Sequence, residues 1–335
     1  MRADRRAHTR PSSSACRSGL VAGLLVFGLM ACGPATQIVT PVPAAVSRQS
    51  AIPPGAVKRT PADDVYPPIL HSTDYSDPVP MPGPINTAGL EDSPFVAPDG
   101  RFYFFFTPSA AVPAEKQLFD GVTGIYSATP GNAGWQDPQR VLLQDAGKLA
   151  LDGCTFVRGD QMWFCSAREG WDGINWFVAN GSDGAWGDWQ SAAPLLPQDV
   201  QVGELHFTSD GLTLYFHSDR STGAGGRDLW MAVRDASGAW SPSVNVTEVN
   251  TEADEGWPYL TPDGQELWFT RIYMGSPGIF RSQRLGDRWS APELVVERFA
   301  GEPTLDEQGN LYFVHHYYRD GTMLEADLYL AARRD

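Results

Sequence analysis

The stretch GELHFTSDGLTLYFHSDR, residues 203–220, places two short apolar segments on either side of a Ser-Asp-Gly sequence. Bulky and aromatic side chains favour strands, and Asp-Gly between two such runs is a strong signal for a tight hairpin. The phrase recurs as APDGRFYFFF (97–106), VRGDQMWF (157–164), TPDGQELWF (261–269) and DEQGNLYF (306–313). The chain is therefore a repeat of strand-turn-strand units.

Two further elements accompany these hairpins. A short apolar phrase comes next, as in GIYSA (124–128), NWFVA (175–179), DLWMA (228–232), GIFRS (278–282) and DLYLA (327–331). In four units a Trp turn follows, and its Trp135, Trp189, Trp240 and Trp289 recur about every 50 residues. Units of this length with three or four short strands are typical of β-propeller blades. The sequence predicts an all-β fold, a five-bladed propeller.

The fifth unit lacks the Trp turn and the outer strand that follow the other units. Residues 77–92 resemble residues 241–255, the phrase that joins the third unit to the fourth. We therefore expect residues 72–86 to supply the outer strand of the last blade and to close the ring without an open edge. On this interpretation the propeller domain spans residues 72–335.

The N-terminal 31 residues have the features of a signal peptide. A basic stretch precedes the apolar run GLVAGLLVFGLMA (19–31), which is too short to span a membrane. The run ends in Leu-Met-Ala-Cys (29–32), which resembles the bacterial lipobox and implies lipidation of Cys32; an ordinary signal peptide is the alternative. We expect an exported protein anchored to the bacterial cell envelope. The proline-rich residues 32–71 predict a disordered tether.

Composition and motifs limit the classes of partner and the kinds of site that we expect. The formal net charge is −15, and nucleic-acid binding needs a basic surface, so we expect no nucleic-acid partner. The sequence has neither a metal-ligand spacing nor a nucleotide-binding fingerprint, which predicts no metal and no cofactor. Cys154 and Cys165 flank a hairpin that turns at Gly159-Asp160 and would face each other. In an exported protein the two residues could form a disulfide, and two buried thiols are an equal alternative.

The repeats resemble those of TolB-type propellers, a Pro-Asp-Gly relative of the Trp-Asp repeats, most closely over residues 203–271. The resemblance implies that the Asp-Gly turns and the aromatic pairs are scaffold. Members of that group are commonly exported, and many act in binding or in envelope assemblies. The resemblance therefore implies a binding or scaffolding module, with a glycan or an envelope protein as its partner.

An acidic residue stands near the start of the innermost strand in every unit. These acids are Glu91 or Asp92, Asp152, Glu204, Asp254 or Glu255, and Glu302. In a propeller the strand starts converge on one mouth of the central channel, so we expect several of these carboxylates to lie near one another. Crowded carboxylates shift one another's pKa values, which can divide acid and base roles.

The chain also resembles the five-bladed arabinanase and β-xylosidase glycosidases. Those enzymes place an Asp base, a tuning Asp and a Glu acid at the starts of their first three blades. The resemblance implies Asp92 as base, Asp152 as tuning residue and Glu204 as general acid of a hydrolase for arabinose- or xylose-type glycans. Aromatic residues that would stack on sugars in such a site are Trp171, Trp176 and Trp257. The alternative is that the acids cap turns throughout the repeat.

Overall fold

The computed structural model describes residues 46–182, 184–201 and 203–334. The predicted signal peptide and Cys32 lie outside this part of the chain. Within these ranges, helix is confined to three short elements, which are α1 (Arg48–Ala51), α2 (Ala114–Gln117) and the 3-10 turn η1 (Ala193–Leu195). No helix in the described ranges has the length and apolar character needed to cross a bilayer.

Most strands of the described residues form five antiparallel meanders, which follow one another along the chain. The first two are β3 (Leu90–Val96), β4 (Phe102–Thr107), β5 (Gly124–Ala128) and β8 (Gln139–Arg140), then β9 (Ala150–Arg158), β10 (Gln161–Arg168), β11 (Ile174–Ser182) and β12 (Ala185–Ser191). The third is β13 (Leu205–Phe207), β14 (Thr213–Ser218), β15 (Asp228–Val233) and β16 (Val244–Asn245). The fourth is β17 (Glu255–Leu260), β18 (Glu266–Tyr273), β19 (Ser276–Leu285) and β21 (Glu293–Glu297), and the fifth is β22 (Ala300–Leu305), β23 (Leu311–Arg319) and β24 (Thr322–Ala331).

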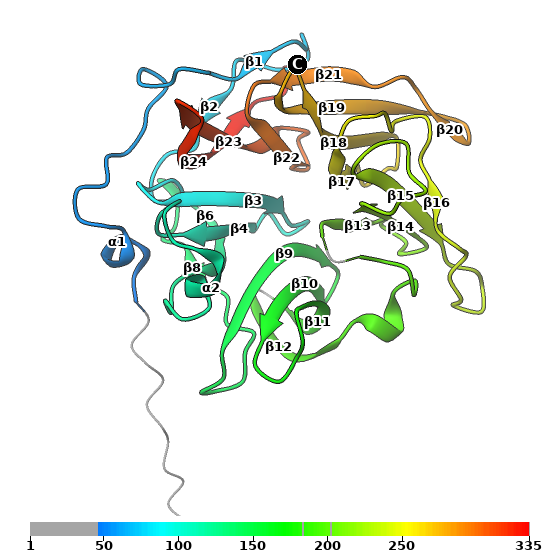
Figure 1. The fold of residues 1–335 in the computed structure, drawn as a ribbon, viewed down its shortest axis with the longest axis horizontal. Coiled ribbons are helices and arrows are strands. Elements are labelled where there is room, and N and C mark those ends of the chain that lie inside the picture. The colour runs from blue at the N-terminus through cyan, green and yellow to red at the C-terminus, as the bar shows by residue number, and fades with distance from the viewer. Residues whose placement is uncertain (1–45, 183, 202, 335) are drawn as a thin grey trace, which may run out of the picture. The chain divides into compact units, whose positions relative to one another are not determined.

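The first strands of the meanders surround a common centre. Each of them contacts the first strand of the next meander, and β22 of the fifth contacts β3 of the first (Figure 1). Antiparallel sheets arranged in a ring around a central channel, typically about four to eight of them, make a β-propeller. The all-β propeller predicted from the repeats is therefore the fold of the described residues.

Short strands add to this ring. The strands β1 (Ile69–Leu70) and β2 (Val79–Pro80) come from the N-terminal side, and β1 pairs with β21 while β2 pairs with β24. The hairpin of β6 (Pro130–Gly131) and β7 (Gly134–Trp135) and the strand β20 (Arg288–Trp289), which pairs with β19, form the predicted Trp turns of two units. The fifth and first meanders are joined by a parallel pairing of β24 with β3 at Ala326 and Leu90. We call this junction the seam.

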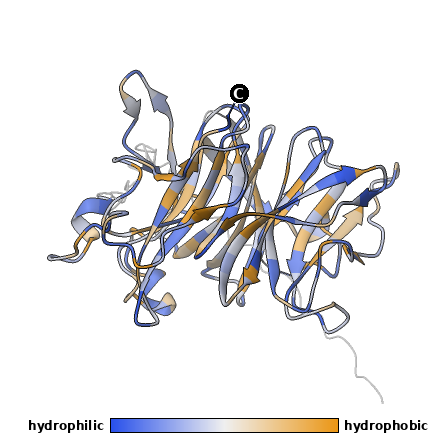
Figure 2. Ribbon diagram, turned by 90° about the horizontal axis from the view of Figure 1, so that it is seen from above, coloured by the Kyte–Doolittle hydropathy of each residue, from blue (hydrophilic) through white to orange (hydrophobic). Residues whose placement is uncertain are grey.

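The aromatic pairs of the repeat are the core. Figure 2 shows apolar residues concentrated along the strands, where the sheets face one another. Buried members of these pairs include Phe102, Phe104, Phe164, Phe216 and Phe269. Cys154 and Cys165, on β9 and β10, are joined by a disulfide whose Cα atoms lie 5.3 Å apart.

Most inner strands share an irregularity near their start. The pairing shifts register between Asp92 and Phe95, between Gly256 and Tyr259, and between Gly301 and Thr304. The residue at each shift has a positive φ, as does its counterpart on β9: these residues are Ser93 (48°), Cys154 (54°), Trp257 (52°) and Glu302 (57°). A β-bulge of this kind redirects the side chain that it carries. We call this place the bulge position.

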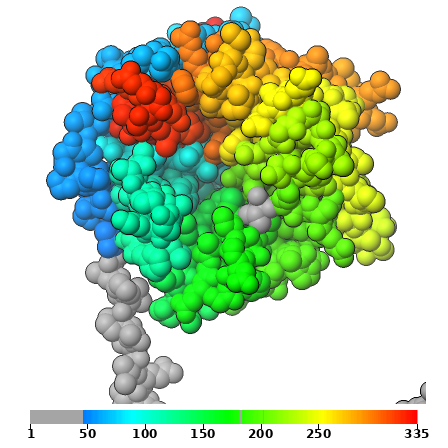
Figure 3. Space-filling model, in the orientation of Figure 1, coloured from blue at the N-terminus to red at the C-terminus, as the bar shows by residue number. Residues whose placement is uncertain are grey.

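The N-terminal segment differs from the tether predicted over residues 32–71. Its described part, from residue 46, packs on the propeller beside the first and last meanders, as the blue atoms of Figure 3 show. Arg48 is buried, and the Asp64 side chain is 1% exposed. Proline content predicts that a segment forms little regular structure, but such a segment becomes ordered when its side chains have partners on another surface.

Candidate functional site

The central channel is narrow and largely filled by side chains. Its cavity has a volume of about 40 Å³, room for no more than a few water molecules. The wall is made by the starts of all five inner strands, and includes Ser93, Thr155, Glu204, His206, Trp257, Tyr259, Glu302 and Thr304.

The acids predicted from the sequence fall into two structural classes. Glu91, Asp152 and Glu255 lie at paired positions of their strands, two residues before the bulge position. Glu302 lies at the bulge position, two residues further along, and Glu204 corresponds to it by its distance from the Asp-Gly turn. We call the first three the paired acids and the last two the channel acids.

Each paired acid binds an arginine and a hydroxyl group. Glu91 lies 3.1 Å from Arg48, Asp152 2.8 Å from Arg168, and Glu255 2.6 Å from Arg271. The hydroxyl donors are Thr87, Ser166 and Thr251, each at 2.6 Å. The three carboxylates are at most 3% exposed. A buried carboxylate with a cation and a hydroxyl donor is a structural cap.

Among the residues that the structure describes, no lysine, arginine or histidine forms an ion pair with either channel acid. Burial, and then the charge of nearby Asp92, raise the pKa of Glu204 to about 8. Burial, Asp92 and Glu204 together raise the pKa of Glu302 well above its ordinary value. The Glu302 Oε2 atom is buried and has no hydrogen-bond partner. Two carboxyl groups therefore line the channel in an environment that favours their neutral, protonated forms.

Asp92 lies between the two classes in sequence and differs from both. Its side chain is 32% exposed, and its Oδ1 accepts a hydrogen bond of 2.9 Å from the Ser93 backbone. The second oxygen, Oδ2, lies 3.9 Å from His316 Nε2, beyond hydrogen-bond range. Burial raises the pKa of Asp92, but His316 and the Ser93 N–H lower it by more, so the pKa lies below its ordinary value. At neutral pH Asp92 is therefore ionised, and no donor among the described residues makes a hydrogen bond to its Oδ2.

A larger cavity opens beside Asp92. Its volume is about 220 Å³, and its wall consists of Leu90, Asp92, Phe105, Thr107, Ser109, Ala110, Val112, Gln117 and Met323. The wall combines one carboxylate, two hydroxyl groups and one amide with apolar side chains. We call this cavity the Asp92 pocket. Its residues come from β3, β4, the segment after β4 and the tip of the β23–β24 hairpin.

The three predicted catalytic residues lie in different surroundings. Asp92 lines the Asp92 pocket and its charge raises the pKa of Glu204, which lines the channel, whereas the Asp152 carboxylate is bound by Arg168 and Ser166. Glu302, which the sequence places only among the possible caps, is the second channel acid. Counting back from the turn in the sequence would have identified Glu302. Glu204 and Glu302 occupy the same place in their repeats, six residues before the third residue of the turn that follows.

The three tryptophans predicted to stack on sugars lie in different surroundings. Trp176 is buried and donates a long hydrogen bond of 3.4 Å to the Gln201 carbonyl, so it is unavailable for stacking. Trp171 is 42% exposed, and Trp257 lines the channel. Burial lowers the pKa of the channel residue His206 to about 3. Its ring is neutral and packs between Phe156 and Tyr259, with ring centroids 4.7 and 4.8 Å away.

The described residues contain no group of three or more His, Cys, Asp or Glu side chains that could hold a metal ion. The side chains that line the two cavities supply carboxyl groups, hydroxyl groups, an imidazole, one amide and aromatic rings.

Comparison with solved structures gives likenesses of two kinds. TolB from Acinetobacter baumannii has a TM-score of 0.44 and 12% identity, over 75% of this chain and 56% of that one. A xylan β-1,4-xylosidase from Bacillus halodurans has a TM-score of 0.45 and 12% identity, over 74% and 53%. The catalytic domain of a Coprinopsis cinerea α-L-arabinofuranosidase has a TM-score of 0.43 and 11% identity, over 76% and 95%.

Both kinds of protein that the repeats resemble are thus among the similar structures. Because the TM-scores lie below 0.5, no statement about activity or ligand follows from them. No protein-family model and no curated protein sequence matches the chain.

Proposed function

We propose that the protein is an exported, lipid-anchored binding module that holds one unit of a glycan in the Asp92 pocket. The observation that carries this proposal is a pocket of about 220 Å³ with one ionised, partly exposed carboxylate in its wall. This volume is below the ~300–1,000 Å³ of sites for drug-sized ligands and suits a single small ring.

The donor and acceptor groups of the pocket match a hydroxylated ligand. Asp92 Oδ2 has no hydrogen-bond donor within range and can accept from a ligand hydroxyl. Thr107, Ser109 and Gln117 supply groups that both donate and accept. Phe105 and Leu90 offer apolar surface to the carbon face of a ring. A sugar presents both kinds of surface at once.

We further infer that each antiparallel meander is one blade, which makes five. The pairing of Val79 in β2 with Leu330 in β24 supports the closure of the last blade by an N-terminal strand. The predicted signal peptide supports export, and the predicted lipidation of Cys32 supports attachment of the propeller to the cell envelope.

Calorimetric titration of the purified full-length protein with arabinose-, xylose- and galactose-containing oligosaccharides tests the binding proposal. We expect one member of the panel to bind and the Asp92→Asn variant to bind it at least about tenfold more weakly, because a charged acceptor is lost. Glu169→Gln is the control, since Glu169 is exposed and lies on another meander. The proposal fails if no sugar binds, or if Asp92→Asn binds as the wild type does.

A glycoside hydrolase is the second candidate, and one observation favours it. The pKa of Asp92 lies below its ordinary value, whereas that of Glu204 is raised to about 8, which is how a base and an acid are divided between two carboxyl groups. Glu204, however, lines the narrow channel rather than the Asp92 pocket. Hydrolysis of the same panel, abolished in a folded Glu204→Gln variant, would establish an enzyme; the absence of turnover would leave the binding module.

A further inference from the structure

Residues 46–66 form an extended strap across the edge of the propeller where its first and last meanders meet (Figures 1 and 3). The strap contributes no strand, so its attachment depends on side chains. Three of them, Arg48, Lys58 and Asp64, reach partners that lie far away in the sequence.

Arg48 attaches the strap to the first meander. Its Nη1 donates to Glu91 Oε1 at 3.1 Å and to the Ile85 carbonyl at 2.9 Å. The guanidinium also lies over the rings of Phe104, Phe106 and Tyr126, at 5.1, 5.2 and 5.4 Å from their centroids. This cation is buried, paired and packed.

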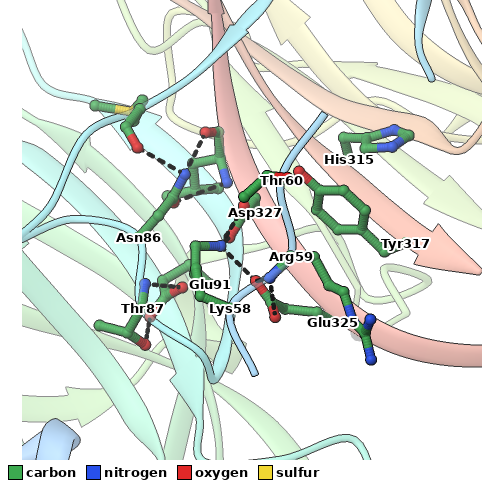
Figure 4. Close-up of polar contacts among 12 residues, drawn as sticks. Lys58, Arg59, Thr60, Asn86, Thr87, Glu91, His315, Tyr317, Glu325 and Asp327 are labelled. Carbon is green, nitrogen blue, oxygen red and sulfur yellow. Dashed lines mark hydrogen bonds and ion pairs between the residues drawn. The ribbon is translucent and has the colours of Figure 1, made fainter. Parts of the chain in front are cut away.

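Lys58 attaches the strap to the last meander. Its ammonium group contacts the carboxylates of Glu325 and Asp327 on β24, and the Arg59 backbone donates to Glu325 at 3.0 Å (Figure 4). The two carboxylates are 2% and 0% exposed. A further pair joins Asp64 Oδ2 to His315 Nε2 at 2.8 Å, and both side chains are at most 1% exposed.

The residues that hold the strap are neighbours of residues that line the Asp92 pocket. Leu90 lines the pocket and precedes Glu91; Met323 lines it and stands two residues before Glu325. The strands involved, β3 and β24, pair at the seam through Leu90 and Ala326. The strap therefore binds one strand on each side of the seam, and the pocket wall spans the same two strands.

We propose that the strap is a latch that holds the seam closed and thereby fixes the wall of the Asp92 pocket. Without Lys58, two buried carboxylates face each other with no cation, and separation of the strands that exposes them to water becomes easier. The effect on ligand rests on the proposed function; the effect on the seam does not. Coupling of this kind is reciprocal, so a ligand in the pocket also holds the strap in place.

Amide hydrogen exchange of the full-length protein tests the latch. In Lys58→Met we expect exchange at residues 90–92 and 323–327 to rise by on the order of tenfold or more, and residues 213–218 and 228–233 of the third meander to keep wild-type rates. Lys58→Arg keeps the charge and should restore protection. Lys148→Met is the matched control, because Lys148 pairs with Glu169 on the surface at 2.5 Å.

Two results of the exchange experiment overturn the latch: unchanged exchange at the seam in Lys58→Met, or an equal rise in every meander.

A second experiment tests the coupling between strap and pocket. It measures cleavage of the strap by a protease with and without any sugar that binds in the calorimetric panel. We expect bound sugar to slow cleavage in the wild type. If no sugar of the panel binds, the binding proposal fails while the exchange result still decides the latch; if a sugar binds and cleavage is unchanged, the coupling is refuted.

Discussion

The paired acids and the channel acids occupy places only two residues apart in the repeat, yet their surroundings are opposite. Glu91, Asp152 and Glu255 each contact an arginine and a hydroxyl group. Glu204 and Glu302 line a cavity, and the buried Oε2 of Glu302 has no partner. A shift of two residues, produced by the bulge, separates the two environments.

This difference distinguishes acids that stabilise the scaffold from acids that could take part in binding or catalysis. The same kind of ion pair, between an acid and an arginine, recurs in three meanders. Such a repeated contact stabilises the inner strands and belongs to the scaffold. A carboxyl group buried without a cation destabilises the fold, and proteins usually keep such groups where function requires them. Glu302 rather than Asp152 is therefore the candidate functional carboxyl group beside Asp92 and Glu204.

The comparison predicts its largest effect at a paired acid. Arg168→Met leaves the Asp152 carboxylate buried without its cation and should lower the free energy of unfolding by about 3–5 kcal/mol. Methionine keeps part of the packing that Arg168 makes over Phe177 and Trp189, at 4.4 and 4.2 Å from their centroids. Guanidinium unfolding at pH 7 measures the change.

The double variant Asp152→Asn/Arg168→Met is the control for this loss. It removes the charge together with its partner, so it should recover part of the lost stability. Equal losses in the single and double variants would contradict the view that Arg168 acts mainly through Asp152.

Local patterns in the sequence were sufficient to predict the propeller. Asp-Gly turns followed by aromatic pairs, as in residues 208–216 and 261–269, specify hairpins through contacts between near neighbours. The position of the acids was harder, because Glu91 and Glu302 both stand near a strand start, and the distance to the following turn, which reflects the register of the bulge, decides which one faces the channel.

The strap could not be predicted for a different reason. Lys58 and Asp64 find their partners, Asp327 and His315, about 250 residues later, and no periodic pattern connects them. A proline-rich composition describes the conformation of a segment, but it does not tell whether another surface binds that segment. Contacts at this separation become visible only when the ring is assembled.

A channel acid should respond with the opposite sign to a paired one. Glu302→Gln removes a carboxyl group whose pKa is raised by burial and by Asp92, and should increase the free energy of unfolding at pH 8 by about 1–3 kcal/mol. Thermal unfolding at pH 8 measures the gain. At pH 4.5 the gain should shrink, because the unfolded chain then also holds the proton. A loss of stability at pH 8 would show that Glu302 has an unrecognised partner.

The pH dependence of stability is the next effect in size. Glu204 has a folded pKa of about 8 and an ordinary value of 4.5 when unfolded, so the folded state holds the extra proton between these values. Stability is therefore present at low pH and falls as pH rises, by at most about 1.4 kcal/mol per pH unit for one group. Glu91 and Asp327, raised to about 7, act with the same sign.

The buried histidines do not obscure this slope above about pH 7.5. Burial lowers the pKa of His206 and His217 to about 3, so about one pH unit above their ordinary value of 6.5 both are almost fully neutral in either state. We expect the melting temperature to fall from about pH 7.5 to about pH 8.5, and to fall less steeply in Glu204→Gln. Parallel curves for the two proteins would mean that Glu204 is ionised in the folded state.

The smallest effect should come from an ion pair of good geometry that is exposed. Lys148 and Glu169 lie 2.5 Å apart, a shorter distance than in any of the three paired acids, but their side chains are 54% and 45% exposed. Water solvates both charges whether or not they meet, and salt screens what remains, so Lys148→Met should leave the melting temperature unchanged. Scanning calorimetry at low and high salt measures this. A clear loss at low salt would mean that distance rather than burial decides the strength of these pairs, and the contrast between paired and channel acids would then need another cause.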